Sequence, residues 1–492
     1  MIAILPILIP VVFMIIHLVI RKPGLAIISG VTGSLVLLIS SIAIVHEVFT
    51  NGIMAMVVGG WEAPSGISIV IDQMSALFLL VSSVIVVAIS IYARNFENKS
   101  QYLPRFYLFF FSLILGINGA FITGDIFNMY VWFEVMLLSS FALMNLGFSR
   151  QQMRSAIKYM ALNLVGSLFF LAGIGLLYGK TGTLNMAHLA EILMNDEQSI
   201  LINTSAMLFF LAFGIKAAVF PLHFWLPASY HTPDITVSSL FAGILTKVGV
   251  YALIRYFTLF FVHDPLFWHS LLFVIAGLTM VIGGMAAASR YETRKILSYH
   301  IISQIGYMIF GLAIFTPLGI AGAIFFALHN MLAKTNTFVV SGLISRMRGS
   351  YSLKDVGGLF KESPFLAVLF IIPAFALAGI PPLSGFYAKF ILIKAGFEDG
   401  HIWITAIAIL ASMLTLYSMI KIWNEAFMKK VPAHVEHKKI VRLRFLDLLP
   451  SIILGGATIL MGIFAATVFD FTLEAAESLL NPVHYLEEVL SK

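Results

Sequence analysis

The sequence predicts an all-α polytopic membrane protein of about 14 transmembrane helices, and two observations support this fold class. Of the 492 residues, 60% are hydrophobic and 11% are charged, whereas about a quarter of the residues in a soluble domain are charged. Long apolar runs also recur along the whole chain, and a helix needs about 20 apolar residues to cross a bilayer. A strand barrel would give shorter segments of alternating hydrophobicity.

The apolar runs give the approximate positions of the helices. The first run lacks a basic start and a small-residue cleavage site, so we expect a retained helix rather than a signal peptide. The polar stretches at 48–64, 180–200 and 425–446 are too short for a separate soluble domain, and we expect loops or short amphipathic segments there. Transmembrane helices are expected at residues 2–20, 24–46, 72–93, 106–124, 126–148, 153–178, 202–220, 236–258, 266–288, 294–315, 317–343, 363–397, 402–424 and 447–469.

The basic residues separate between the two sides of this arrangement. When the loops are numbered alternately, only Lys180, Arg255 and Lys492 fall on one side. On the other side lie 22 of the 30 Lys and Arg, near residues 21–22, 94–105, 150–158, 290–295, 346–361 and 421–444. Because cytoplasmic loops carry an excess of Lys and Arg, we expect both termini on the extracytoplasmic side of the cell membrane. The net charge of +6 then reflects topology, and no nucleic-acid binding is predicted.

Cysteine usage and histidine spacing limit the kinds of metal and cofactor site that this chain can contain. The chain contains no cysteine, which excludes disulfides, thiolate metal sites and iron–sulfur clusters. The 13 histidines show no metal-binding spacing, and no glycine-rich phosphate-binding loop is present. We therefore expect no cofactor and no metal in this chain, so any redox chemistry would belong to a partner.

Five lysines lie within or near the ends of apolar runs: Lys216, Lys247, Lys334, Lys389 and Lys394. A charge in the middle of a bilayer costs several kcal/mol, so such groups usually face a wet cavity and mark an ion path. The alternative is a long side chain that extends from a helix end to the interface. We favour this alternative for Lys394 and a role in ion movement for Lys216, Lys247 and Lys389.

Glu134 lies in an apolar run without another charge nearby in the sequence. A buried carboxylate is neutralised unless it is paired, and a lysine on another helix offsets the cost of burial for both groups. Separating such a pair would lower the proton affinity of the lysine. We therefore expect Glu134 to pair with a buried lysine, in a functional pair or in a purely structural one.

Two of the lysine-bearing helices are interrupted. Phe220-Pro221 follows Lys216, and the stretch 379–385, which contains Pro381 and Pro382, precedes Lys389. Proline and glycine remove helical hydrogen bonds and free carbonyl groups to face a cavity, and paired broken helices are typical of transporters built from repeats. We expect two inverted five-helix repeats with broken helices 7 and 12. We divide the chain into residues 1–105, which contain helices 1 to 3, a first repeat at 106–258, a second repeat at 266–424, and a final segment at 425–492 with a cytoplasmic loop, the last helix and the C-terminal tail.

Further titratable groups could extend a proton path. His329 lies near the middle of its expected helix and Lys334 follows five residues later, and histidine titrates near neutral pH. His300 lies about two turns from a basic loop, where it could serve a cytoplasmic entrance. A hydrogen-bonded core histidine is the alternative interpretation for both histidines.

Three segments resemble one known family. Residues 124–134 read GDIFNMYVWFE, residues 214–227 read GIKAAVFPLHFWLP, and residues 295–307 read KILSYHIISQIGY. They resemble the proton-pumping membrane subunits of complex I and of the Mrp cation/proton antiporters, over roughly residues 70–430. Residues 225–230, WLPASY, resemble the antiporter D subunits, since complex I subunits usually have aspartate after the proline. His300 departs from the family, which more often has serine there.

The resemblance implies a function and a set of site residues. It implies a proton-translocating subunit of a multi-subunit sodium/proton antiporter that is driven by the proton-motive force, a secondary transporter rather than an enzyme. Its partners would be the other Mrp antiporter subunits (A, B, C, E, F and G), together with protons, Na⁺ and the lipid bilayer. The alternative is a pump subunit of an NADH:quinone oxidoreductase or a membrane-bound hydrogenase. The residues that match the family's proton path are Glu134, Lys216, Lys247 and Lys389.

Overall fold

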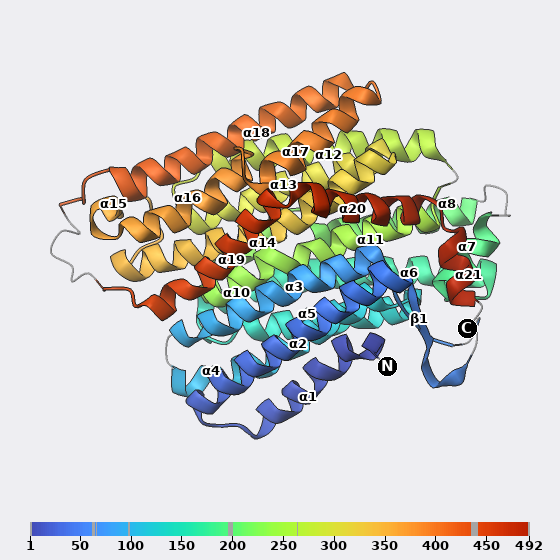
Figure 1. The fold of residues 1–492 in the computed structure, drawn as a ribbon, viewed down its shortest axis with the longest axis horizontal. Helices are drawn as coiled ribbons and strands as arrows, with labels where there is room; N and C mark the ends of the chain where they lie inside the picture. The colour runs from blue at the N-terminus through green and yellow to red at the C-terminus, as the bar shows by residue number, and fades with distance from the viewer. Residues whose placement is uncertain are drawn as a thin grey trace.

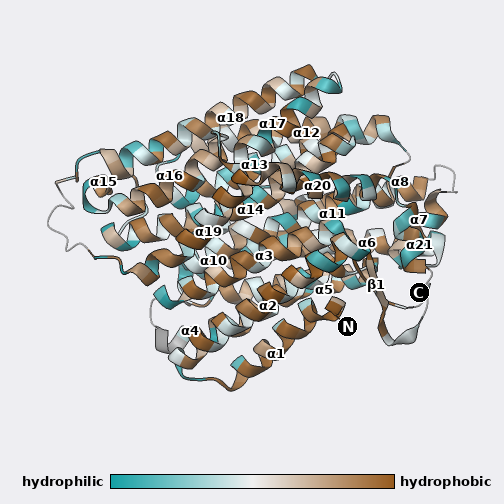
Figure 2. Cartoon of the chain, viewed as in Figure 1, coloured by the Kyte–Doolittle hydropathy of each residue, from teal (hydrophilic) through white to brown (hydrophobic). Residues whose placement is uncertain are grey.

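The computed structural model describes residues 2–61, 64, 66–96, 99–194, 200–262, 264–433 and 441–490. These residues are nearly all helical, which confirms the all-α polytopic fold class (Figure 1). Within them, 13 helices are long and apolar enough to cross a membrane, and hydrophobic residues dominate along their lengths (Figure 2). Lys438, Lys439 and Lys492, which entered the topology prediction, lie outside the described residues.

The first half of the chain has the helices α1 Leu5–Val19, α2 Pro23–Asn51, α3 Gln73–Tyr92, α4 Lys99–Ile122, α5 Ile126–Met144, α6 Arg150–Thr181, α8 Ile200–Ala217, α10 Ile235–Leu240 and α11 Thr246–Leu259. The second half has α12 Pro265–Ser289, α13 Thr293–Ile314, α14 Pro317–Arg348, α16 Pro364–Ala378, α17 Ser384–Glu398, α18 Ile402–Trp423, α19 Phe445–Ile463, α20 Ala465–Leu480 and α21 Val483–Leu490. Further short elements are β1 Met54–Val57, β2 Ser68–Ile71, α7 Met186–Met194, α9 Trp225–Ser229 and α15 Leu359–Glu362.

The interrupted helices lie where proline and glycine predict them. The span expected at 363–397 consists of α16 and α17, separated by residues 379–383, and Gly379 has a φ of 87°. Helix α8 ends at Ala217, and Ala218 has a φ of 64°. The total of 14 spans and the division into inverted repeats remain predictions.

Some elements were missed because hydropathy does not reveal them. β1 and β2 form an antiparallel hairpin with Met54 opposite Ile71, in a region where only loops or short amphipathic segments were expected. The helix expected at 447–469 ends at Ile463, and the chain continues as α20 and α21. Helix α20 buries Ala475, Ala476 and Leu479 and exposes acidic residues on its other face. Its average hydropathy is therefore too low for it to appear as an apolar run.

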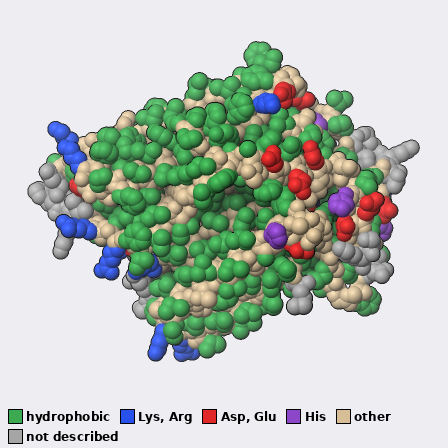
Figure 3. Space-filling view, in the orientation of Figure 1, with side chains coloured by type: hydrophobic (Ala, Val, Ile, Leu, Met, Phe, Trp, Pro, Cys, Tyr) green, Lys and Arg blue, Asp and Glu red, His purple; other side chains and the backbone are tan. Residues whose placement is uncertain are grey.

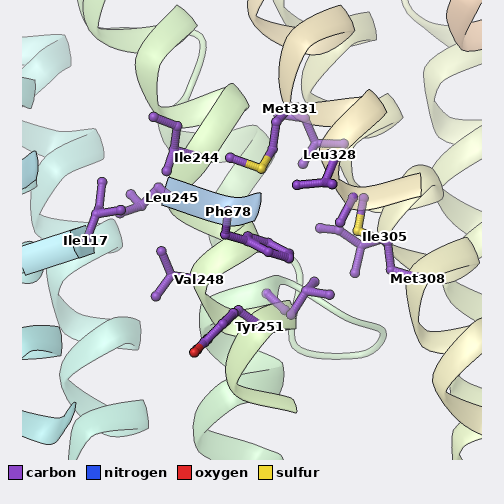
Figure 4. Close-up of a cluster of buried hydrophobic side chains, with 14 of the residues drawn as sticks. Phe78, Ile117, Ile244, Leu245, Val248, Tyr251, Ile305, Met308, Leu328 and Met331 are labelled. Carbon is purple, nitrogen blue, oxygen red and sulfur yellow. The ribbon is translucent and has the colours of Figure 1, made fainter. Parts of the chain in front are cut away.

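The most deeply buried helices are α10–α11, α13 and α14, which together form the centre of the molecule. They share an apolar cluster with Phe78 of α3 and Ile117 of α4, to which α14 contributes Leu328 and Met331 (Figure 4). Helices α1 and α2 lie at the periphery and leave most of their side chains at least partly exposed. The centre of the molecule is therefore shielded from lipid by its own outer helices.

Charged side chains divide between the two ends of the helices. Figure 3 shows most of the Lys and Arg on the visible face at one end, and Asp, Glu and His toward the other. Both termini lie toward the acidic end (Figure 1). Several basic residues also close helix ends: Lys421 Nζ donates to the carbonyl oxygens of Ala288 and Arg290 at 3.0 and 2.6 Å. We call the end that carries most of the Lys and Arg the basic end of the molecule, and the opposite end the acidic end.

Candidate functional site

Four lysine side chains lie buried or partly buried on helices α8, α11, α14 and α17. Lys247 of α11 and Lys334 of α14 are fully buried, and Lys389 of α17 is 4% exposed. Lys216 of α8 is partly buried. Lys247 and Lys389 both act electrostatically on Lys334, so the structure brings these three predicted residues into one electrostatic group. We call the four lysines the lysine row.

Lys216 and Glu134 are neighbours without direct contact. Lys216 Nζ lies 5.6 Å from the ring centroid of Phe133, the residue before Glu134, and the two charges interact electrostatically. Among the described residues, however, they form no ion pair, and Glu134 Oε1 has no hydrogen-bond partner. The expected pair therefore exists as an interaction at a distance. A cavity of about 10 Å³, also lined by Tyr159 and Asn163, borders Lys216 and has room for about one water.

Lys247 lies directly after a local widening of its helix. Residues Phe241–Leu245 form a π-helical turn between α10 and α11, a feature found frequently at functional sites. Lys247 Nζ donates to the carbonyl oxygen of Ala242 inside this turn, at 2.8 Å. Gly243 makes the packing possible, because a Cβ there would lie 2.1 Å from Thr335 Oγ1 of α14. Sequence analysis missed the turn because it leaves hydropathy unchanged.

Unpaired polar atoms concentrate around the centre of α14. Lys334 Nζ, both polar side-chain atoms of Asn330 and both ring nitrogens of His300 on α13 are buried without a hydrogen-bond partner. His329 is different, since its Nδ1 lies 2.8 Å from Ser384 Oγ at the start of α17. Burying polar groups without partners is costly and therefore rare. A cluster of them inside a membrane protein is typical of a path for protons or ions.

Lys389 has the richest set of contacts in the lysine row. Its Nζ donates to the carbonyl oxygen of Ala378 at 3.0 Å and to Ser412 Oγ of α18 at 2.8 Å. The same atom lies 5.4 Å from the ring centroid of Tyr307. Ala378 is the last residue of α16, so Lys389 satisfies a carbonyl at the end of that half-helix, where a cation is electrostatically favoured.

Gly379 is required at this break in two ways. Its φ of 87° is a conformation that other residues rarely adopt, and a Cβ would lie 2.8 Å from Lys389 Cδ. Ser412 was not predicted, because it comes 23 residues after Lys389 and on another helix. Lys394, by contrast, is half exposed and lies 3.7 Å from Glu398, which agrees with its interpretation as a side chain that extends to the interface.

A buried ion pair near the acidic end was also missed. Arg255 of α11 binds Asp72 through two contacts of 2.6 and 2.7 Å, and both side chains are almost fully buried. Burial raises the pKa of Asp72, but Arg255 and the hydrogen bonds from Arg255 and Ser75 hold it below its ordinary value. Asp72 also caps α3 by accepting from Ser75 N. Arg255 is thus a structural cation, and its partner lies 183 residues away in the sequence.

A cavity of about 310 Å³ opens near the basic end and is lined by Ser149, Asp234, Arg294 and Tyr351 among others. Arg294 Nη1 donates to the carbonyl oxygen of Pro233 at 3.1 Å, and its guanidinium lies 3.9 Å from the ring centroid of Tyr351. Helix α10 leads inward from this cavity, with Thr236, Ser238 and Ser239 buried along it. The helix ends at the π turn that holds Lys247, so α10 lies between the cavity and the lysine row.

Known proteins are similar to this chain in sequence and in fold. Residues 123–415 match the family described as NADH:quinone oxidoreductase/Mrp antiporter, TM. The D subunit of the Na(+)/H(+) antiporter of Alkalihalophilus pseudofirmus is 43% identical, over 93% of this chain and 92% of the relative. The protein of the same name from Bacillus subtilis is 39% identical over 99% of both chains. A chain of the Mrp complex from Dietzia sp. superimposes with a TM-score of 0.91 at 30% identity, over 99% of both chains.

Proposed function

This chain belongs to the NADH:quinone oxidoreductase/Mrp antiporter family, and we propose that it is a proton-translocating subunit of a multi-subunit sodium/proton antiporter driven by the proton-motive force. The names of its relatives support the reaction and the assembly with other Mrp subunits. The observation that carries the proposal is the lysine row with its sparse hydrogen bonding. Burying the amino group of Lys334 without a hydrogen-bond partner is costly, and a purely structural core gains nothing from it.

The proposed path runs between the two ends of the helices. From the positive-inside rule we infer that the basic end faces the cytoplasm and that both termini lie outside. The cavity at Arg294 and Asp234 then forms the cytoplasmic mouth, and α10 connects it to Lys247. His329 and Lys334 continue the path to Lys389 by way of waters, with His300 beside it. External protons move through this chain while the assembly moves sodium in the opposite direction.

Repulsion within the lysine row provides the driving step. Lys247, Lys334 and Lys389 share a low-dielectric interior, and positive charges on Lys247 and Lys389 repel a positive charge on Lys334. A proton that arrives on one lysine therefore promotes release from another. The carboxylate of Glu134 acts electrostatically on Lys216, so this pair forms a second charged group beside the other three lysines.

The test is sodium-induced proton movement in inverted vesicles that contain the complete native assembly and no electron donor. Lys216→Ala and Glu134→Ala should abolish the sodium-dependent signal at unchanged abundance in the membrane. Lys394→Ala is the matched control, because it removes a lysine whose side chain is half exposed, and it should exchange at the wild-type rate.

Two other results would contradict the proposal. If proton movement required a redox donor in the wild type, the chain would be a pump subunit of an oxidoreductase complex. If the Lys216 and Glu134 variants were missing from the membrane, the pair would be structural.

A further inference from the structure

A second cavity, separate from the proton path, lies at the basic end between α1 and α4. It has a volume of about 670 Å³, and two arginines, Arg21 and Arg105, line it together with the apolar side chains of Leu18, Ile20 and Leu108. Both arginines are exposed. Among the described residues, no carboxylate lines this cavity and no ion pair involves either guanidinium. The cavity is therefore cationic at its rim and apolar along its wall.

The shape of this cavity is fixed by His17. This buried side chain lies 2.7 Å from the carbonyl oxygen of Phe13 through Nδ1 and 3.3 Å from that of Ala26 on α2 through Nε2. Its ring also stacks on Tyr107 of α4, with centroids 5.3 Å apart. These contacts join α1 to both α2 and α4. The turn between α1 and α2 is thus held in place, and Arg21 stays on the rim.

The cavity lies at the end of the apolar helix α1, where the headgroup level of a bilayer is expected. Arg21 lies just beyond the end of α1, and Lys22 adds a further cation. Toward the membrane interior, α1 exposes Ile15 by 53% and Leu18 by 64%. Guanidinium groups bind phosphate oxygens through paired hydrogen bonds, and basic pockets on the cytoplasmic side of membrane helices bind anionic headgroups. The positive charge of the cavity, its position at the end of α1 and its apolar wall therefore all fit an amphiphilic anion.

We propose that this cavity binds the headgroup of an anionic phospholipid from the cytoplasmic leaflet. Arg21 and Arg105 hold the phosphodiester between them, and an acyl chain follows the exposed face of α1. A free phosphate ion would use the arginines but not this apolar face. The site is independent of proton transfer, because it lies at the outer helices α1 and α4 and shares no residue with the lysine row.

The experiment uses the purified complete assembly in phosphatidylcholine vesicles that contain a photoactivatable phosphatidylglycerol. Mapping of the labelled peptides should place the label on residues of α1 and α4. Unlabelled phosphatidylglycerol should compete for this labelling, whereas added phosphatidylcholine and inorganic phosphate should not. Equal labelling by a photoactivatable phosphatidylcholine would overturn the proposal, as would crosslinks from this face to a partner protein in place of lipid.

Variants give an independent test. Arg21→Gln/Arg105→Gln should lower labelling of α1 and α4 by roughly fivefold for each arginine removed. Arg150→Gln/Arg154→Gln is the matched control, since it removes the same charge from exposed positions on α6 at the same end, and it should label as the wild type does. Unchanged labelling in the first variant would refute the site. The competition experiment on wild-type protein decides the question if that variant does not assemble.

Discussion

Buried charges in this protein fall into two sets that differ in how they are satisfied. Arg255 near the acidic end has a carboxylate partner, donates further hydrogen bonds to Ser75 and Tyr251, and has the ring of Tyr485 nearby. The lysine row has no carboxylate in direct contact, and Lys334 has no hydrogen-bond partner at all among the described residues. Full pairing makes a charge structural, whereas incomplete pairing leaves it free to change its protonation state.

The largest expected effect comes from breaking the paired set. Asp72→Asn leaves Arg255 buried and uncompensated, which should cost about 3–5 kcal/mol of folding free energy. The measurement is thermal unfolding of the purified protein in detergent. Because the pKa of Asp72 is lowered in the folded state, the pair stabilises above the ordinary aspartate pKa and is lost as the pH falls below it. The double variant Asp72→Asn/Arg255→Met should recover most of the loss. A single variant as stable as wild type would show that the pair is not needed.

Asp125 is an intermediate case, a buried carboxylate without a cation, and it should give the next largest effect. Burial raises its pKa from about 3.8 to about 6. Folding then favours the protonated form, so stability is greatest below the ordinary pKa and falls as the pH rises through 6. The difference corresponds to roughly 3 kcal/mol at most. Unfolding temperatures between pH 4 and 7 should fall for wild type and stay flatter for Asp125→Asn, which keeps the helix cap.

Asp264→Asn is the control for that experiment, since Asp264 also caps a helix but is only partly buried. Its pH profile should match that of wild type. Parallel pH profiles for wild type and Asp125→Asn would mean that burial does not raise the pKa of the Asp125 carboxyl group.

The unpaired set should respond in the opposite way. Lys334→Met removes a buried cation that has no partner, so the variant should be as stable as wild type or more stable. The exchange rate should nevertheless fall at least about tenfold, because the row loses its central proton acceptor. This corresponds to about 1.4 kcal/mol of activation free energy. Vesicle exchange and thermal unfolding, measured on the same preparation, separate the two effects. Normal exchange, or a large loss of stability, would move Lys334 into the structural set.

The smallest effect is expected from a residue that positions a lysine. Ser412→Ala removes one of the two hydrogen bonds of Lys389 Nζ and leaves the bond to Ala378. The loss of one such bond corresponds to about 1 kcal/mol, so exchange should slow about fivefold with a shifted pH optimum. Ser412→Thr keeps the hydroxyl and should restore both the rate and the optimum. A lower rate with an unchanged optimum would indicate a packing defect.

Sequence reasoning identified the groups whose signal is local. A lysine or a glutamate inside an apolar run is visible by itself, and so is a break that contains Pro381 and Pro382. Partners that lie far apart in the sequence give no such signal, as with Asp72 and Arg255 or Lys389 and Ser412. The π turn before Lys247 was also invisible, because one extra residue per turn does not change composition.

The depth of the lysine row has an electrical consequence. Lys247 lies near the midpoint of the combined span Ile235–Leu259, and Lys334 near the midpoint of α14, and both spans are long enough to cross a membrane. A proton that moves between such helices at constant depth moves perpendicular to the transmembrane electric field. Such a movement involves almost no electrical work. On the proposed path, the roughly 2.3 kcal/mol that a charge exchanges with a potential of 100 mV is therefore divided between the steps that bring a proton to the row and those that take it away. Membrane voltage should accelerate the arrival and departure of protons and leave their passage along the row unaffected.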